Sequence, residues 1–443
     1  MNYIAHRRTN NRVAGGNGAV LSAALRRYAA ILLLLAGSGC AVAAVDVAEG
    51  ESDAAAEKVY GVTYTVTPDA KRGTALVEMR VEQSRRLLRE ITMRMPEDRF
   101  SDFSGDGEII RENDELRWLP ASNGGELRWT VQVPHRRYGN TFDAWLGKQW
   151  GLFRASDIIP PAGSRTVVGA QSRTRLQFDL PKGWSAVTQF AGRRGVYSVP
   201  RGERRFNRPT GWILIGKLGV RIETIAGVRV VVAGPKGQGV RRLDMLALLH
   251  WTLPQLTKVL PDFPKRLAIV SAKDGMWRGG LSGPGSLYIH ASLPLISENA
   301  TSTLLHEVIH IGSGLRAASG ADWIVEGLAE YYALEILRRS RSISQERFDD
   351  AIKELVAWGK QADNLCAENS TAAITARAVG IFAALQRELR ASTKKTKPLD
   401  EVLRALVATG DAVTVSDLRE TALAANGGSA PRTLSARNLP GCT

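Results

Sequence analysis

The sequence predicts an α+β protein, in which an antiparallel β-rich region of sandwich type precedes a mainly helical region. Short runs of alternating apolar and polar residues, separated by glycine and proline, fill residues 58–235. Beyond the turn-forming segment Gly234–Gly237, apolar residues recur instead with the period of a helix. The 443 residues are enough for two domains, each with its own core.

The composition excludes several classes of protein and leaves a basic chain. With 44% hydrophobic and 23% charged residues, the chain is neither fibrous, nor wholly disordered, nor a polytopic membrane protein. Three cysteines are too few for a disulfide scaffold or a thiolate zinc finger. The net charge is +15, and it is +10 without the five arginines of the first 39 residues. We expect no nucleic-acid partner, because the basic run Lys394–Lys397 is typical of a solvated loop.

The N-terminus predicts export from a bacterial cell. Arg26 and Arg27 precede the apolar run Tyr28–Ala36, which is too short to span a bilayer but fits a secretory signal peptide over residues 1–43. Lipidation of Cys40 is an open alternative and would attach the protein to a membrane, although Gly37 replaces the usual leucine of a lipobox. The protein is expected in the periplasm or cell envelope, with residues 44–57 as a linker.

The N-terminal domain is predicted over residues 58–235. Val59–Val66 and Ala75–Val81 have the alternation of strands. Leu116–Leu119 and Leu127–Val133 flank Asn123–Gly125, a combination that predicts a hairpin. Further strands are expected at Arg175–Leu180, Trp212–Ile215 and Val228–Val232.

The second domain is predicted over residues 236–426. A helix over Val240–Leu260 is followed by short strands at Leu267–Ser271 and Ser286–His290, and by further helices. The polar segment 427–443 is expected to be a loose C-terminal tail. In an exported protein Cys366 and Cys442 could form a disulfide or remain free thiols, and the sequence leaves both open.

One motif in the predicted helical domain indicates metal binding and catalysis. In His306-Glu307-Val308-Ile309-His310, the two histidines are four residues apart and therefore lie on one face of a helix, where both can bind one Zn²⁺. Glu307 lies beside the metal and could take a proton from a water that the metal activates. The alternative is that these are two surface histidines on an ordinary helix. In that case the acidic residues described next would be there by coincidence.

A third protein ligand is expected fifteen residues after His310. Glu326 lies on the next predicted helix, and packing of the two helices across the glycine-bearing loop Gly312–Gly320 would direct it at the metal. Glu330, one turn further, could accept the free ring N–H of a ligand histidine. Position 316 is Arg316, which excludes the third histidine of a metzincin.

These residues resemble a known family. His306-Glu307-x-x-His310 followed by Trp323-x-x-Glu326-Gly327-x-Ala329 is similar to the gluzincin metallopeptidases, and most similar to the clan of aminopeptidase N and the periplasmic glycyl aminopeptidases. The resemblance implies a thermolysin-like catalytic domain, one zinc ion on His306, His310 and Glu326, and Glu307 as general base. It also implies a peptide or protein as substrate.

The sequence departs from this family at three places, the first of which is a slightly shorter loop between His310 and Glu326. Gly279, Gly280 and Leu281 belong to the expected substrate strand, which lacks the glutamate that holds a substrate's free amine in the aminopeptidases. Thr375 occupies the position matched to a tyrosine that stabilises the oxyanion, and His290 is one candidate substitute. We therefore predict an exported zinc metallopeptidase, aminopeptidase-like by default, with endopeptidase activity open. The alternative is a catalytically weak scaffold that binds zinc or peptide in the cell envelope.

Overall fold

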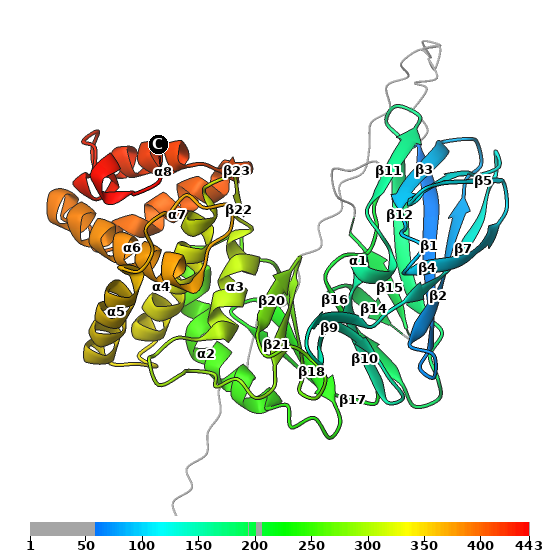
Figure 1. The fold of residues 1–443 in the computed structure, drawn as a ribbon, viewed down its shortest axis with the longest axis horizontal. Helices are drawn as coiled ribbons and strands as arrows, with labels where there is room; N and C mark the ends of the chain where they lie inside the picture. The colour runs from blue at the N-terminus through cyan, green and yellow to red at the C-terminus, as the bar shows by residue number, and fades with distance from the viewer. Residues whose placement is uncertain (1–57, 194, 201–205, 443) are drawn as a thin grey trace, which may run out of the picture. The chain divides into compact units, whose positions relative to one another are not determined.

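The computed structural model describes residues 58–193, 195–200 and 206–442. The predicted signal peptide, the linker and Cys40 lie outside these residues, so they stay predictions. Within the described residues a β-rich region precedes a helical one, as expected (Figure 1). No helix in this part of the chain is long and apolar enough to cross a membrane.

The largest sheet has seven strands in the order β14-β15-β12-β1-β2-β7-β4. Adjacent strands in this sheet are antiparallel, except β1 and β12, which are parallel. Along β1 every second residue is buried, as the alternation in the sequence predicts. The strands of this sheet are β1 (Val59–Asp69), β2 (Thr74–Glu82), β4 (Phe100–Gly105), β7 (Gly124–Gln132), β12 (Gln171–Phe178), β14 (Ala191–Arg193) and β15 (Val196–Val199).

A second sheet, in the order β11-β3-β6-β5, shares one hydrophobic core with the first. Its strands are β3 (Leu88–Arg94), β5 (Glu108–Glu112), β6 (Glu115–Leu119) and β11 (Ala162–Thr166). The hairpin predicted around Asn123–Gly125 is therefore wrong, because β6 pairs with β3 and β5 while β7 pairs with β2 and β4. Trp118 on β6 and Trp129 on β7 are fully buried in the shared core, so the chain crosses from one sheet to the other between them.

A third sheet, in the order β13-β16-β10-β9-β8, follows in the β-rich region. All five residues of its strand β16 are buried. The strands are β8 (His135–Tyr138), β9 (Thr141–Leu146), β10 (Trp150–Arg154), β13 (Ser185–Val187) and β16 (Trp212–Gly216), with the short helix α1 (Ala155–Ile158) after β10. A small core shared with the next sheet contains Trp212 of β16 and Tyr288.

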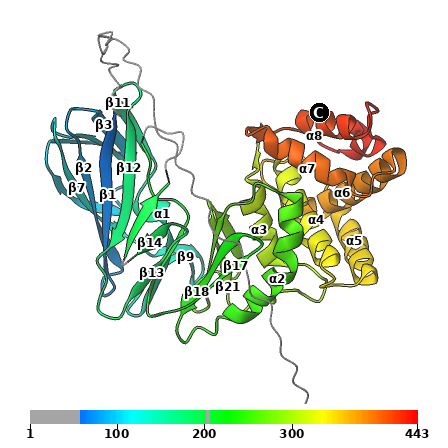
Figure 2. The same cartoon turned by 180° about the vertical axis from the view of Figure 1, so that it is seen from behind.

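The fourth sheet, in the order β17-β18-β19-β21-β20, carries the residues next to the candidate site. β18, β19 and β21 are parallel, and β17 and β20 form antiparallel edges. The strands are β17 (Leu218–Ile225), β18 (Val228–Pro235), β19 (Arg266–Ala272), β20 (Gly280–Gly283) and β21 (Ser286–His290). Helix α2 (Arg242–Val259) packs on it, as the view from behind shows (Figure 2). This sheet extends across the domain boundary predicted at residue 235.

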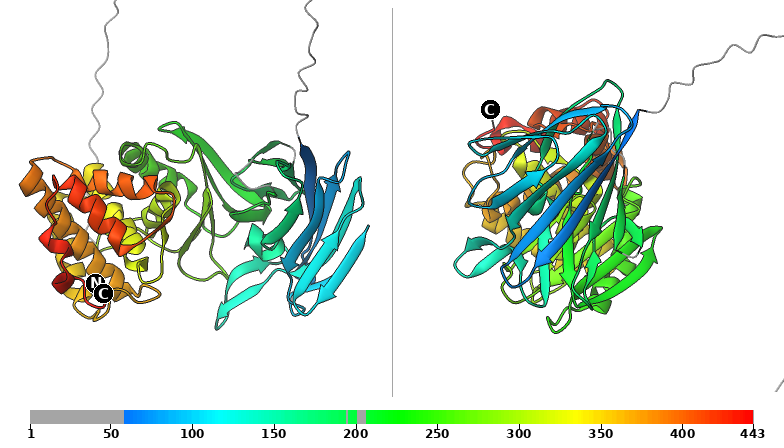
Figure 3. Two further views of the ribbon diagram at one scale, coloured as in Figure 1. Left: turned by 90° about the horizontal axis from the view of Figure 1, so that it is seen from above. Right: turned by 90° about the vertical axis from the view of Figure 1, so that its right-hand side faces the viewer.

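The remaining helices form the other side of the largest core. They are α3 (Thr303–Ser313), α4 (Asp322–Arg339), α5 (Gln345–Gly359), α6 (Ala372–Thr393), α7 (Pro398–Ala408) and α8 (Val415–Ala425). The orange and red helices α6, α7 and α8 pack in succession (Figure 3). The two-residue strands β22 (Arg316–Ala317) and β23 (Ala412–Val413) join the α3–α4 connection to the α7–α8 connection.

The C-terminal segment is packed, whereas the sequence suggested a loose tail. Leu434 and Leu439 are buried in the core of the helical region. Cys366 and Cys442 form a disulfide with a Cα–Cα distance of 5.1 Å, and the backbone N–H of Leu365 donates to Pro440 O. Two apolar side chains among polar neighbours were too weak a signal to show this attachment.

Removing the disulfide is expected to lower the stability of the helical region. The bridge closes a loop of 76 residues, so Cys366→Ser with Cys442→Ser should cost about 2–4 kcal/mol through the greater freedom of the unfolded chain. Urea denaturation of the wild type with and without a reductant, and of the double variant, measures this cost. A reductant should destabilise the wild type and leave the variant unchanged; equal midpoints in all samples would contradict the prediction.

Candidate metal centre

Helix α3 begins and ends where its local sequence requires. The Ser302 hydroxyl accepts a hydrogen bond from the Leu305 backbone N–H at 3.3 Å, which caps the first turn. Gly314 ends the helix in the left-handed region, with φ of 60°, which favours glycine. Leu304 and Val308 are buried and fix the rotation of the helix against the core. The histidines then lie on a different face from this buried pair.

His306 and His310 meet one turn apart on α3, and Glu326 reaches them from α4. The Nε2 atoms of the two histidines are 3.0 Å apart. Glu326 Oε2 lies 3.2 Å from His306 Nε2, and its Oε1 lies 3.4 Å from His310 Nε2. The structure thus brings together the three residues that the sequence singled out as ligands, in a group that could hold a metal ion.

The donor set and its spacing fit a small divalent ion. Two imidazoles and one carboxylate are the protein ligands of many catalytic zinc sites, which keep a fourth position for water or substrate. Tetrahedral zinc with bonds of about 2.0–2.1 Å places neighbouring donors roughly 3.3 Å apart. The observed separations of 3.0, 3.2 and 3.4 Å are close to this value. Among the residues that the structure describes, no other group of three or more His, Cys, Asp and Glu side chains brings its ligand atoms within 4.8 Å of one another.

The electrostatics of the cluster favour a cation between these side chains. Burial opposes a charge on His306, but hydrogen bonds with Glu326 and Glu330 outweigh it and raise the pKa of His306 to about 10. Burial likewise opposes the charge on Glu326, but hydrogen bonds with both histidines hold its pKa well below the usual range. The carboxylates of Glu326 and Glu330 thus both contact one imidazole, and their negative potential attracts a positive charge.

Glu330 orients one of the two histidines. Its Oε2 lies 2.9 Å from His306 Nδ1, so the ring can donate its Nδ1–H to this carboxylate and turn the Nε2 lone pair toward the cluster. Glu330 lies one turn after Glu326 on α4, and its side chain is 15% exposed. The position agrees with the geometry expected from the sequence.

Glu330→Gln is expected to weaken metal binding without removing a ligand. An amide oxygen can still accept the His306 Nδ1–H, but it carries no charge, so we expect an affinity for Zn²⁺ about 10–100-fold lower. Competition with a chromophoric chelator measures the affinity. Glu346→Gln on α5, an exposed acid outside the site, is the matched control and should leave the affinity unchanged. An unchanged affinity in Glu330→Gln would show that the negative charge of Glu330 contributes nothing to metal binding.

Glu307 belongs to α3, and its side chain lies against the edge strand β20. Its side chain is buried, with 7% of the residue exposed, and burial raises its pKa. The Ser282 hydroxyl donates a hydrogen bond to it, a contact that the sequence does not reveal because nothing distinguishes one hydroxyl in a glycine-rich segment. A side chain at Gly280 would begin 3.0 Å from Glu307 Cγ, so glycine at this position leaves room for the acid. A buried carboxylate with a raised pKa is suited to proton transfer.

The other predicted substrate residues lie on or beside β20 and β21. Leu281 O accepts the Trp212 indole N–H at 2.9 Å, and Gly279 O accepts the His290 backbone N–H at 2.9 Å. The His290 ring interacts with Lys273 O through Nε2 and with the Ser292 hydroxyl through Nδ1, and burial lowers its pKa. Within the described residues no hydrogen bond links His290 to the cluster. Its role toward a substrate stays a prediction, as do those of Gly279, Gly280 and Leu281.

Comparison with known proteins gives a clear result for the fold. No family model matches the sequence, and no curated protein is similar to it in sequence. Among solved structures, an aminopeptidase N family protein from Idiomarina loihiensis matches with a TM-score of 0.63 at 14% identity, over 82% of this chain and 75% of that one. A mutant M1 zinc metallopeptidase from Deinococcus radiodurans matches with a TM-score of 0.54 at 16% identity, over 87% and 95% of the two chains. The chain therefore has an aminopeptidase N-like fold, which confirms the predicted fold class and the resemblance.

Proposed function

We propose that this protein is a zinc-dependent peptidase. The observation that carries the proposal is the convergence of His306, His310 and Glu326, with the buried acid Glu307 beside them. The same fold occurs in a solved aminopeptidase N family protein and in a solved M1 zinc metallopeptidase, which supports peptide hydrolysis as the reaction. Two surface histidines on an ordinary helix would need neither Glu326 between them nor Glu330 behind one of them.

Each residue has a defined role in the proposed reaction. His306, His310 and Glu326 would hold the zinc ion, which supplies Lewis acidity for the activation of water and the polarisation of a peptide carbonyl. Glu307 accepts the proton of the attacking water on its carboxylate and delivers it to the leaving amine. Glu330 keeps the His306 ring oriented by its 2.9 Å hydrogen bond.

The substrate would lie along β20, an edge strand whose free side can pair with an extended peptide. Trp212 stabilises this strand from the β-rich region through its bond to Leu281 O. The fold makes aminopeptidase activity the first expectation. Because the segment Gly279–Gly283 contains no acid to bind a free amine, peptides with free and with acetylated N-termini must both be tested. Cleavage restricted to acetylated substrates would identify an endopeptidase.

Zinc content is the decisive measurement. We expect about one zinc per chain in the wild type, and loss of zinc and of peptide hydrolysis in His306→Ala and His310→Ala. His135→Ala removes an exposed histidine on β8 and should retain both. A folded wild type that holds no zinc would overturn the proposal. Zinc without cleavage of free or blocked peptides would favour the alternative, a scaffold that binds zinc or peptide.

We also propose that the protein acts outside the bacterial cytoplasm, in the periplasm or on the cell envelope. The disulfide supports this location, because such bonds persist in oxidising compartments. The predicted cleavage near Ala43 and the alternative lipidation of Cys40 give mature chains of different mass. Mass spectrometry of protein from cell fractions distinguishes them, and an uncleaved chain in the cytoplasm would contradict the proposed export.

A further inference from the structure

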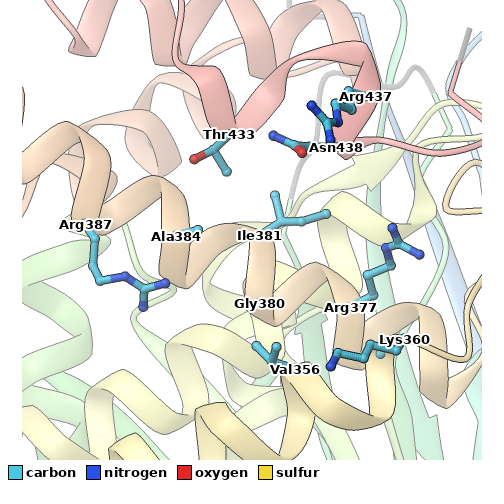
Figure 4. A pocket seen from close by; sticks show the side chains of 11 residues that line it. Val356, Lys360, Arg377, Gly380, Ile381, Ala384, Arg387, Thr433, Arg437 and Asn438 are labelled. Carbon is cyan, nitrogen blue, oxygen red and sulfur yellow. The ribbon is translucent and has the colours of Figure 1, made fainter.

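A cleft of about 580 Å³ opens in the helical region, between α5, α6 and the C-terminal segment (Figure 4). It shares no lining residue with the metal centre or with β20. Helix α6 separates the two sites: Phe382 stacks on Trp323 of α4 at 5.9 Å, whereas Ile381 lines the cleft. The cleft is therefore distinct from the candidate metal centre, and its volume is that of a ligand pocket.

Four cationic side chains surround this cleft. They are Lys360, Arg377, Arg387 and Arg437, and among the described residues that line it there is no carboxylate. Arg377 donates one hydrogen bond, to Ala362 O. The side chains of the other three have no hydrogen bond or ion pair to any residue that the structure describes. None of the four cations forms an ion pair with a residue that the structure describes, so the cleft concentrates positive charge.

The walls of the cleft are held in place. A side chain at Gly359 would begin 2.5 Å from the backbone of Arg377, so glycine here allows α5 and α6 to approach closely. Glu388 on α6 accepts hydrogen bonds from the backbone N–H groups of Arg432 and Thr433, which attaches the C-terminal segment to α6. The disulfide at Cys442 closes the same segment onto the helical region. The backbone segments that bear the four cations are therefore fixed relative to one another.

We propose that the cleft is a second binding site, for a ligand with two neighbouring phosphate groups. A phosphate group carries about −1.5 to −2 charges at neutral pH, so two of them balance four cations, whereas a single carboxylate would leave most of the positive charge uncompensated. Three of the cations are arginines, whose planar guanidinium donates paired hydrogen bonds to phosphate oxygens. Ile381 lies between the cations in Figure 4 and, with Val356, offers an apolar surface to the carbon part of such a ligand.

Soluble diphosphates and the headgroups of an acidic phospholipid layer both offer neighbouring phosphate oxygens. A headgroup phosphodiester carries one negative charge, so more than two headgroups would be needed to balance the four cations. Isothermal titration calorimetry with sodium pyrophosphate at fixed ionic strength tests the first source. Sedimentation with vesicles of phosphatidylglycerol and phosphatidylcholine, against vesicles of phosphatidylcholine alone, tests the second. Both measurements report binding, so neither requires peptidase activity.

The variants separate a specific site from general charge. R387Q/R437Q removes two exposed cations of the cleft, while K353Q/R390Q removes two exposed cations of α5 and α6 outside it. We expect binding at least about tenfold weaker in R387Q/R437Q and changed less than about twofold in the control. Circular dichroism and zinc content should match the wild type in both variants, which shows that the fold is retained.

The outcomes distinguish the sources and can overturn the proposal. Saturable pyrophosphate binding that R387Q/R437Q weakens assigns a soluble ligand. Vesicle binding that needs the acidic lipid and the same two arginines assigns a headgroup. The proposal fails if neither probe binds, if both double variants lose affinity equally, or if binding survives R387Q/R437Q, since the last result would place the anion elsewhere, such as at the metal centre.

Discussion

Glu307→Gln is expected to lower the turnover of a peptide substrate by about 10²–10⁴-fold while zinc stays bound. Glutamine has nearly the same shape as glutamate, but its amide cannot accept the proton of the attacking water. Glu307 is not one of the three converging ligand side chains, so the donors at His306, His310 and Glu326 remain. The change should therefore lower kcat much more than it changes the binding of substrate.

The measurement pairs kinetics with zinc content and stability. Wild type and Glu307→Gln are compared for kcat and KM on one peptide, for zinc by elemental analysis, and for the midpoint of thermal unfolding. Because Glu307 is buried and burial raises its pKa, the neutral amide should not lower the midpoint. Glu354→Gln, an exposed acid on α5, should leave all of these values unchanged. Full turnover in a zinc-loaded Glu307→Gln would show that another group accepts the proton.

More of the candidate site than of the surrounding fold could be predicted from the sequence. The four-residue spacing of His306 and His310 fixes their common face on any helix, so local sequence was sufficient. Glu326 and Glu330 required only that α3 and α4 pack on each other. Ser282 could not be found in this way, because its contact with Glu307 depends on where an edge strand meets a helix.

Strand pairing in the β-rich region was much less predictable. Alternation shows which face of a strand is buried, but it does not show its partner. β1 and β12 are about 110 residues apart and pair in parallel, an arrangement that no local turn signal could indicate. Likewise, Asn123–Gly125 has the composition of a hairpin turn, yet burial of Trp118 and Trp129 in one core outweighs that preference and sends β6 and β7 to different sheets.

Arg339→Ala is expected to lower the free energy of unfolding of the helical region by about 3–5 kcal/mol. At the end of α4, the Arg339 guanidinium donates two hydrogen bonds to Asp400 of α7, at 2.7 and 2.8 Å, and one to Glu335 at 2.7 Å. The side chains of these three residues are at most 8% exposed. The Tyr332 hydroxyl also donates to Asp400 at 3.0 Å. Loss of the arginine would leave two carboxylates buried with too few positive partners.

Arg338 provides the matched control on the same helix. It pairs with the same Glu335 at 2.7 Å, but its side chain is 32% exposed, so water can replace much of the interaction. Arg338→Ala should therefore cost about 1 kcal/mol or less. Urea unfolding followed by the helical circular dichroism signal compares the two variants with the wild type. Equal costs would mean that the burial of the Arg339 pair does not decide its contribution.

Further variants of Arg339, Glu335 and Asp400 distinguish whether charge pairing or side-chain packing holds α4 against α7. If the desolvation of the carboxylates causes the loss in Arg339→Ala, then Arg339→Met combined with Glu335→Gln and Asp400→Asn should recover most of it, because no buried charge is left unpaired. Arg338 loses its partner Glu335 in this variant, but its side chain is 32% exposed and water can solvate the charge. If the lost packing of the arginine stem causes it, Arg339→Met alone should recover the stability. Zinc content should stay near that of the wild type in each folded variant, because Glu326 lies more than three turns from Arg339 along α4. Loss of zinc in a variant that remains folded would instead show that the position of Glu326 depends on this distant contact with α7.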